Sequence, residues 1–407
     1  MPGKVRLVPL PRIAVLGAGP VGLEAALAAA ERGWPTTVYE SDDQVAGNVR
    51  RWGHVRLFTP WAMNVSERMR AALGGDAPDG AALPTGDELA ERLYEPAGRL
   101  PSVSGSLRLG SRILAVGRER LLKHEEIGSP GRERHPFRLL VAGPDGAERV
   151  ERADVVIDCT GTYGHPNRLG DGGIPAPGER ALDGRITRQL PDLAADPGAW
   201  AGQTVLLTGA GHSAQTAARS LAEFARDAAG TRVIWAVRSP EPDWGAVDDD
   251  PLPERASLNA AAGELARGGS PAVDARLGVV TDALSESGGR IEATLQNGGP
   301  EEVTVDRILA LNGGVGDFEI YRQLQVHECY ATGAPMKLSA ALMASAGGGG
   351  DCLAQTSHGP ETLLNPEPNF FILGSKSYGR NSQFLLKIGW EQVDDVFGML
   401  DAAVAPA

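Results

Sequence analysis

The chain has 407 residues, enough for two domains that each bury a hydrophobic core of their own. Hydrophobic residues make up 42% of the sequence and charged residues 22%, as in ordinary globular proteins. The net charge of −13 and the isoelectric point near 5.1 argue against nucleic acid or an anionic membrane as partner, because both require a basic surface. We therefore expect no nucleic-acid partner and no membrane partner.

The three cysteines exclude several metal and redox motifs. Cys159, Cys329 and Cys352 form no C-x-x-C pair, and the histidines form no H-E-x-x-H motif, so we expect no metal site and no thioredoxin-type dithiol. A distant redox pair of Cys329 and Cys352 stays open, with two ordinary buried thiols as the favoured alternative. The small odd number of cysteines and the lack of a signal-like or membrane-spanning apolar run predict a cytoplasmic protein.

The first informative segment is an apolar run at residues 13–16 that continues into a glycine turn. The run predicts a buried parallel strand, and the Ala-rich stretch that begins at Pro20 predicts a helix. Between them, Gly17, Gly19 and Gly22 form the G-x-G-x-x-G pattern. Strand, glycine turn and helix in this order are typical of a dinucleotide-binding βαβ unit.

Each residue of this pattern has a physical task. Gly17 permits a tight turn, Gly19 lets the backbone approach a pyrophosphate, and Gly22 allows close packing of helix against strand. The N-terminus of the helix attracts the phosphate charge. Glu40, at the end of the next predicted strand (36–39), can accept hydrogen bonds from a ribose and would repel a 2′-phosphate. The site therefore favours an adenosine without that phosphate.

A second copy of the pattern follows an apolar strand at residues 204–207. Its glycine turn and helix start contain Gly209, Gly211, Ser213 and Ala214, and alanine is an accepted variant of the third glycine. The sequence thus predicts two dinucleotide sites in one chain.

The second site differs from the first in charge. Arg238 and Ser239 follow the strand expected at 232–237, where the first copy has Glu40. An arginine with a hydroxyl at this place is the usual provision for a 2′-phosphate, so we expect NADPH in preference to NADH. A surface arginine without a ligand stays the alternative.

A further duplication supports two related halves. Hairpins are expected at 137–150 and 291–305, and each is followed by an apolar strand that stops at a glycine turn. In the first half this turn contains Thr160 and Gly161. The whole pattern predicts an α/β protein with two Rossmann-like, three-layer domains.

These motifs, together with the segment 159–167, resemble the flavoproteins with two dinucleotide-binding domains. Within that group the chain is most similar to the flavin-containing and N-hydroxylating monooxygenases, and next to the thioredoxin-reductase-like enzymes. The resemblance implies FAD and NADPH as cofactors and a homodimer as the family habit. It also implies an NAD(P) domain (186–311) inserted into a discontinuous FAD domain (1–185 and 312–407).

The resemblance places further residues near the flavin. The segment 369–376 resembles the returning FAD strand, which usually ends in Gly-Asp, whereas this chain has Gly374, Ser375 and Lys376. A following helix is expected at 382–400. Lys376 and Tyr378 are predicted to face the flavin as catalytic residues, and a polar loop that caps this helix is the alternative.

Three more residues are candidates for the site. Arg56 and Asn64 follow the first βαβ unit, where these folds approach the flavin ring. His358 is the best candidate for a proton-transferring group because histidine titrates near neutrality, although a structural histidine is the more frequent case. The segment 240–269 is expected to be an insertion that covers the active site, or a plain surface loop.

Two departures from the monooxygenase pattern bear on the activity. The fingerprint F-x-G-x-x-x-H appears as residues 182–188, with Arg188 in place of the histidine. The asparagine expected after a Phe-Ser/Thr pair is replaced by Pro60, with Asn64 as a nearby substitute. The leading hypothesis is an NADPH-dependent FAD monooxygenase that oxygenates a small nucleophile through a C4a-hydroperoxyflavin. The alternatives are a reductase of a small disulfide, quinone or other acceptor, and a non-catalytic nucleotide-binding flavoprotein.

Overall fold

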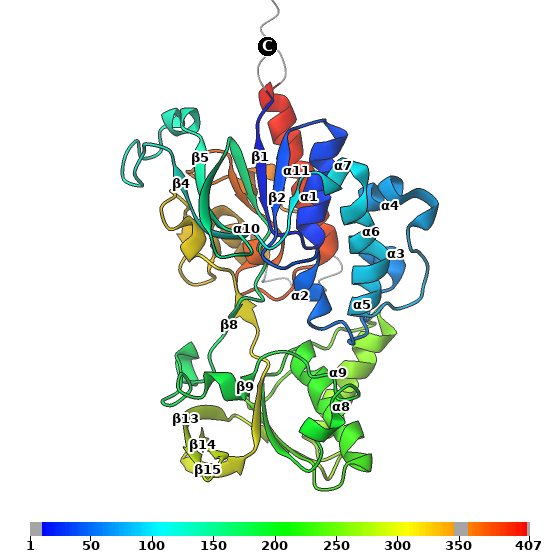
Figure 1. Ribbon diagram of the computed structural model, residues 1–407. Coiled ribbons are helices and arrows are strands. Elements are labelled where there is room, and N and C mark those ends of the chain that lie inside the picture. The colour runs from blue at the N-terminus through cyan, green and yellow to red at the C-terminus, as the bar shows by residue number, and fades with distance from the viewer. Residues whose placement is uncertain (1–9, 346–356, 405–407) are drawn as a thin grey trace, which may run out of the picture. The chain divides into compact units, whose positions relative to one another are not determined.

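The computed structural model describes residues 10–345 and 357–404 (Figure 1). The chain forms two compact units. The first unit consists of Met1–Gly53, Thr59–His165 and Val315–Ala407, and the second of His54–Phe58 and Pro166–Gly314. The chain passes between them on both sides of His54–Phe58 and again at β8 (His165–Pro166) and β17 (Gly314–Val315), and these two strands pair with each other.

This division differs from the predicted domain boundaries mainly at residues 166–185, which were expected in the FAD domain. Leu169 and Leu182 are buried in the hydrophobic core of the second unit. The backbone N–H of Leu284 donates to the carbonyl of Pro177 at 2.8 Å, which fixes the segment to the same unit. Hydrophobic burial and a backbone hydrogen bond therefore hold these residues in the second unit.

The first unit is built on a parallel sheet with the strand order β20-β7-β1-β2-β3. Its strands are β1 (Ile13–Leu16), β2 (Thr36–Tyr39), β3 (Leu107–Arg108), β7 (Val155–Asp158) and β20 (Phe370–Ile372). The register pairs Asp158 with Leu16 on one side and with Ile372 on the other. The turns that follow β1, β7 and β20 therefore begin at the same edge of the sheet.

Both faces of this sheet are covered. On one face the long helices α1 (Pro20–Glu31) and α11 (Leu386–Val404) pack together, and Gly389 allows this approach because a Cβ there would lie 2.6 Å from Val21 (Figure 1). On the other face lies an antiparallel sheet of β4 (Arg112–Arg118), β5 (Phe137–Ala142) and β6 (Glu148–Ala153). The remaining elements are α2 (Gly47–Arg50), α3 (Trp61–Asn64), α4 (Glu67–Leu73), α5 (Gly86–Leu89), α6 (Glu95–Arg99), α7 (Pro101–Ser104), β18 (Glu328–Cys329), β19 (Ala334–Pro335) and α10 (Met336–Ser345).

The second unit repeats this plan. Its parallel sheet has the order β12-β11-β10-β16-β9. The strands are β9 (Ile186–Thr187), β10 (Thr204–Thr208), β11 (Arg232–Val237), β12 (Val273–Leu277) and β16 (Arg307–Ala310). Helices α8 (His212–Asp227) and α9 (Pro253–Ala266) cover one face, and β13 (Val280–Ser287), β14 (Arg290–Gln296) and β15 (Pro300–Val305) cover the other. The expected three-layer α/β fold is thus present in both units.

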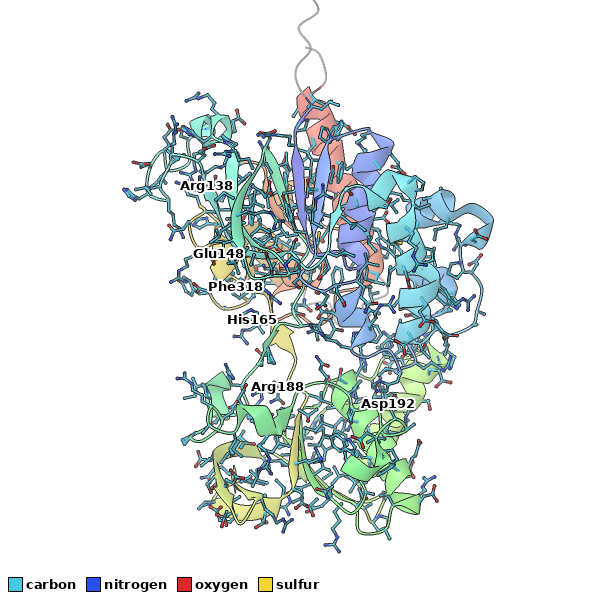
Figure 2. The ribbon with its side chains drawn as sticks, viewed as in Figure 1. Arg138, Glu148, His165, Arg188, Asp192 and Phe318 are labelled. Carbon is cyan, nitrogen blue, oxygen red and sulfur yellow. The ribbon has the colours of Figure 1, made fainter. Side chains whose placement is uncertain are left out.

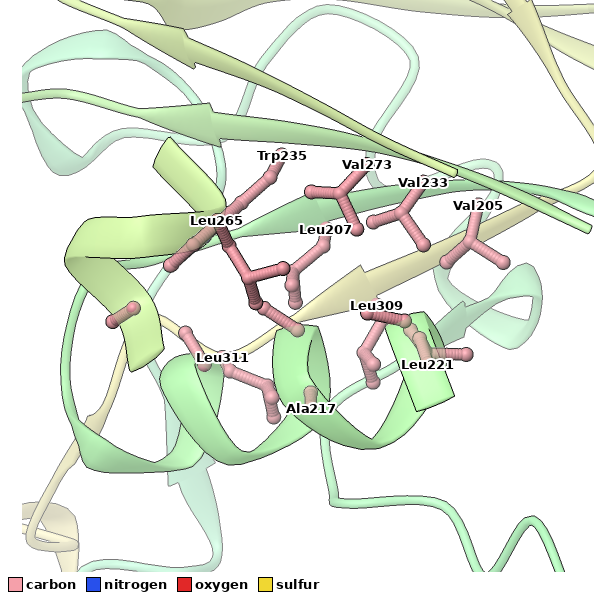
Figure 3. Packing of buried hydrophobic residues seen from close by; sticks show 14 of the residues in the cluster. Val205, Leu207, Ala217, Leu221, Val233, Trp235, Leu265, Val273, Leu309 and Leu311 are labelled. Carbon is pink, nitrogen blue, oxygen red and sulfur yellow. The ribbon is translucent and has the colours of Figure 1, made fainter. Parts of the chain in front are cut away.

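The core between helices and sheet in the second unit includes Trp235 (Figure 3). Its side chain is fully buried, and its indole N–H donates to the carbonyl of Gly209 at 2.8 Å. Leu207, Leu221 and Leu265 supply apolar surface from the strand and from both helices. Core packing and the glycine turn are therefore joined through one side chain.

The segment 240–269 is neither an insertion nor a plain loop. Residues 253–266 form α9, whose Leu258, Ala262 and Leu265 are buried. Strands β11 and β12 are parallel, so the chain needs a crossover of this kind to return to the starting edge. Part of the polar composition that suggested a loop is buried, because Arg255 of this helix pairs with Asp250 at 2.7 Å and both side chains are almost fully buried.

A buried cluster of charges fixes the excursion between β4 and β5. Glu367 accepts from the guanidinium of Arg118 at 2.7 Å and from that of Arg132 at 2.8 Å, and the three side chains have no exposed surface. Arg118 also lies over the ring of Phe137, and burial lowers its pKa.

None of the helices among the described residues is long and apolar enough to cross a membrane.

We predict that Glu367→Gln lowers the free energy of unfolding by about 3–5 kcal/mol, because it leaves two buried guanidinium groups without their counter-charge. The matched control is Glu151→Gln in the same unit, which breaks the half-exposed pair with Arg149 and should cost less than about 1 kcal/mol. Unfolding in urea measures both values. Equal losses in the two variants would contradict the prediction.

Candidate functional site

The first glycine turn has the geometry of a phosphate cradle. Gly17 has a φ of 94°, and a Cβ on Gly22 would lie 1.9 Å from the carbonyl oxygen of Gly17. Gly19 faces open space instead, since no described atom lies within 4 Å of the place where its Cβ would be. Helix α1 begins immediately after it, at Pro20. The turn thus presents free space at a helix N-terminus, where an anionic phosphate is stabilised.

Glu40 lies beside this turn and is almost fully buried. One carboxylate oxygen accepts from the backbone N–H of Ala18 at 2.7 Å, and the other accepts from that of Asp42 at 2.9 Å. A carboxylate has about four acceptor positions, so these bonds orient the group and leave capacity for a ribose hydroxyl. The prediction of a ribose-binding acid therefore has a fitting geometry.

The turns after β7 and β20 meet at the same edge of the sheet. Gly161 and Gly374 both have positive φ, at 70° and 75°. A Cβ on Gly161 would lie 3.7 Å from the hydroxyl of Ser375. Thr160 donates to Asp158 through its backbone N–H and its hydroxyl. The structure thus brings together the two polar turns that the sequence assigned to the flavin.

Lys376 belongs to this cluster, but its side chain is completely buried. Its ammonium donates to the carboxylate of Asp158 at 2.6 Å, to the hydroxyl of Thr160 at 3.1 Å and to the carbonyl of Asp317 at 2.6 Å. These three bonds account for its three protons. The sequence analysis missed Asp158, whose only signal is an acid at the end of an otherwise apolar strand.

Tyr378 ends the same short helical turn, Gly374–Tyr378, and is buried. Its ring packs edge-on against Phe384 with centroids 5.4 Å apart. Its hydroxyl is buried and has no hydrogen-bond partner among the described residues. Burial, with the charge of Glu391 as a smaller cause, raises the pKa of Tyr378 to about 12, so the phenol is neutral at physiological pH. An unpaired buried hydroxyl of this kind suits a ligand that the structure does not contain.

Asn64 is closed off by its own turn. Its amide nitrogen donates to the carbonyls of Thr59 and Pro60 at 2.9 and 2.8 Å, and its oxygen accepts from the hydroxyl of Thr59 at 3.2 Å. The side chain is 4% exposed. Its amide therefore serves the entry into α3, and no donor is left for a flavin.

His358 lies half-buried in a loop that α11 holds in place. The neighbouring Ser357 donates through its backbone N–H to Glu391 and through its hydroxyl to Asp395, both at 2.6 Å. A proton-transferring role for His358 stays a prediction. Of the cysteines, Cys352 lies outside the described residues, and burial raises the pKa of Cys159 well above its usual value.

The second glycine turn repeats the first. Gly209 has a φ of 114°, and a Cβ there would lie 2.3 Å from the carbonyl oxygen of Leu311. Gly211 has open space around it among the described atoms and immediately precedes α8. Ser213 is exposed in the first turn of this helix, whereas Ala214 is buried. The second unit therefore also offers an open cradle at a helix N-terminus.

The residues after β11 keep the charge pattern expected for a 2′-phosphate. Arg238 is exposed directly after the strand, and the hydroxyl of Ser239 accepts from the backbone N–H of Glu241 at 3.3 Å.

The sequence analysis passed over His212, the first residue of α8. Its Nε2 is buried without a partner among the described residues, and burial, with Arg255 as a second cause, lowers its pKa.

One predicted residue, Arg56, lies in a unit other than the one to which the FAD domain was assigned. Arg56 belongs to the second unit, in the segment His54–Phe58, where Phe58 packs edge-on against His212 with ring centroids 5.1 Å apart. Arg56 lines a cavity of about 500 Å³ formed by this segment, the loop 190–194 and the helices α8 and α9. Its assignment to the flavin stays a prediction.

Arg188 stands where the monooxygenase fingerprint has histidine (Figure 2). Its guanidinium lies 2.8 Å from Asp183 and 3.4 Å from the buried carboxylate of Glu179. Glu179 in turn accepts from the backbone N–H groups of Leu169 and Ala176. Arg188 therefore stabilises the segment that precedes β9.

No group of three or more His, Cys, Asp or Glu side chains in the described parts of the chain is arranged to hold a metal ion.

No family model matches the sequence, and no curated protein matches it. Solved structures match over nearly the full chain. Bacillithiol disulfide reductase Bdr (YpdA) from Bacillus cereus has a TM-score of 0.70 at 16% identity, covering 97% of this chain and 99% of that chain. The reduced form of ornithine hydroxylase (PvdA) from Pseudomonas aeruginosa has a TM-score of 0.63 at 16% identity, covering 97% of this chain and 100% of that chain. T. acidophilum thioredoxin reductase has a TM-score of 0.60 at 15% identity, covering 98% of this chain and 100% of that chain. The chain therefore has the two-unit Rossmann-type α/β fold of these solved structures, which confirms the fold that the sequence resemblance implies.

Proposed function

We propose that this protein is an NADPH-dependent FAD oxidoreductase that acts on a small molecule. The observation that carries the proposal is the pair of glycine turns with open space at Gly19 and Gly211, each at the N-terminus of a helix that packs on a parallel sheet. One such turn would fit many nucleotide-binding proteins, whereas two in one chain fit an enzyme that transfers electrons between two dinucleotides.

The charges beside the two turns assign one cofactor to each unit. The buried carboxylate of Glu40 would repel a 2′-phosphate and can bind a ribose, which suits the adenosine of FAD. The exposed guanidinium of Arg238 can pair with the 2′-phosphate of NADPH. FAD held at the first turn would supply the redox chemistry, with NADPH at the second turn as the hydride donor and a small molecule as the electron acceptor. Around the FAD, the turns at Thr160 and Gly374 would position the ring, and the neutral hydroxyl of Tyr378 could donate a hydrogen bond.

We expect Gly19→Ala and Gly211→Ala to separate the two cofactors. Both glycines have extended backbone angles, with φ of −79° and −72°, so alanine fits without strain. A methyl group would instead fill the space of a pyrophosphate. Gly19→Ala should raise the dissociation constant of FAD at least about tenfold, and Gly211→Ala that of NADPH by a similar factor. Calorimetric titration measures both, and each variant is the control for the other.

We further expect Arg238→Ala to raise the KM for NADPH about tenfold or more while changing that for NADH less than about twofold, because only NADPH carries the 2′-phosphate. Arg232→Ala, at the opposite end of the same strand, is the control and should leave both constants unchanged. Steady-state kinetics with the two coenzymes measures the difference. Equal effects of Arg238→Ala on both would remove the reason for preferring NADPH.

The destination of the electrons is the second part of the proposal. The sequence favours a monooxygenase, but the amide nitrogen of Asn64 donates to carbonyls of its own turn, and Arg188 pairs through Nη2 with the carboxylates of Asp183 and Glu179. The two residues that could have replaced the monooxygenase motifs are thus engaged elsewhere. This observation favours the alternative, a reductase of a small acceptor such as a disulfide. Bdr from Bacillus cereus, which is a disulfide reductase, has the same fold over 97% of this chain.

Rapid mixing separates these two activities. The protein is reduced with NADPH without oxygen and then mixed with oxygenated buffer, while the flavin absorbance is followed. For a reductase we expect a direct return to the oxidised spectrum. A transient flavin species that differs from the oxidised and reduced forms, and that decays faster with a nucleophilic substrate, would instead support assignment of the protein as a monooxygenase.

A further inference from the structure

The most unusual polar feature of the first unit is the ion pair between Asp158 and Lys376. The ammonium lies 2.6 Å from the carboxylate, and neither side chain has any exposed surface. Asp158 ends a strand whose other residues are valine and isoleucine. Burying such a pair is costly, and an apolar pair of similar volume often stabilises a fold equally well or better. Fold stability alone therefore does not account for it.

The pair connects three separate segments of the chain. The ammonium reaches the turn after β7 through Thr160 and the segment after β17 through the carbonyl of Asp317. The other carboxylate oxygen of Asp158 accepts the backbone N–H of Thr160 at 3.0 Å and its hydroxyl at 2.7 Å. All three protons of the ammonium and both donors of Thr160 are used within the group, which restricts its movement.

The surrounding backbone is shaped to admit the lysine. A Cβ on Gly316 would lie 2.4 Å from Cγ of Lys376 and within 2.9 Å of two further carbons of the same side chain. Lys376 cannot swing away because its far end is held by three acceptors. Its ammonium also lies 4.9 Å from the centre of the Tyr321 ring. A glycine at 316 is thus required by the ion pair.

The pair lies directly behind the first glycine turn. The backbone N–H of Cys159 donates to Leu16 at 2.9 Å, and a Cβ on Gly17 would lie 2.9 Å from the carbonyl oxygen of Cys159. On the other side, the backbone N–H of Leu373 donates to the carbonyl of Asp158, again at 2.9 Å. A shift of the pair would therefore move the turns after β1, β7 and β20 together.

We propose that Asp158 and Lys376 are positioning residues that hold the turns 159–161 and 374–375 at the separation needed to bind the flavin. The inference rests on the proposed function, because it assigns these turns to FAD. It also replaces the predicted catalytic role of Lys376. In this role the lysine acts through the backbone segments that it holds in place. Its ammonium is paired with the carboxylate of Asp158 and does not contact the cofactor directly.

The test compares charge loss with charge-neutral replacement in the full-length protein. Lys376→Met leaves a buried carboxylate without its partner and should lower the melting temperature by roughly 10 °C. The double variant Asp158→Leu/Lys376→Met removes both charges and should recover most of that loss. If the pair positions the turns, the double variant should still bind FAD about tenfold more weakly than the wild type, with a shifted absorption maximum of the bound flavin. If the pair serves stability alone, the double variant should bind FAD within about twofold of the wild type with an unchanged spectrum, and the proposal is overturned.

Two further variants make the result specific. Gly316→Ala pushes against the lysine stem without approaching the glycine turn and should raise the dissociation constant of FAD about fivefold. Glu367→Gln breaks the other buried charge cluster of this unit, so it should lower the melting temperature and leave FAD affinity within about twofold. Weakened binding in Glu367→Gln equal to that in the double variant would attribute the effect to general instability and overturn the proposal.

The outcome for the proposed function is read separately. Failure of the wild-type protein to bind FAD would refute the assignment of the cofactor itself. Tight FAD binding by the wild type and the double variant alike would leave the oxidoreductase in place and remove only the positioning role.

Discussion

The parallel register of β1, β7 and β20 is the constraint on which the candidate site depends. Because Leu16, Asp158 and Ile372 stand side by side, the turns that follow them leave the sheet at the same edge. The strand register alone thereby brings together turns that are distant in the sequence. The backbone hydrogen bonds of the ladder supply this alignment, and each strand is apolar because helices cover one face of the sheet and an antiparallel sheet covers the other.

The second unit obeys the same constraint with different chemistry at the edge. Its glycine turn approaches the end of β16 at Leu311, as the first turn approaches the end of β7 at Cys159. The first unit places a buried acid beside its turn, and the second places an exposed arginine after β11. A shared backbone geometry thus binds two nucleotides in our proposal, and single side chains distinguish between them.

Charge is buried in the first unit at two places with different consequences. Glu367 joins two arginines and ties the excursion after β4 to the segment before β20, at the opposite end of that strand from the Gly374 turn. Asp158 and Lys376 join the segments that carry the candidate flavin site. Both clusters satisfy their donors and acceptors, which is what allows charge in an apolar interior. Their difference lies in which backbone each one fixes.

Local pattern was sufficient to predict the strands, the glycine turns and the two α/β halves, because apolar runs and glycine spacing reflect interactions between near neighbours. The sequence therefore determined the fold class and the place of both cradles. It could not pair Asp158 with Lys376, which are 218 positions apart, because no spacing rule relates residues that only the sheet brings together. It also could not show that Asn64 is consumed by its own turn, that Arg56 belongs to the second unit, or that residues 253–266 form the crossover helix. Those outcomes depend on which donors, acceptors and apolar surfaces meet in three dimensions, and only the tertiary structure decides that.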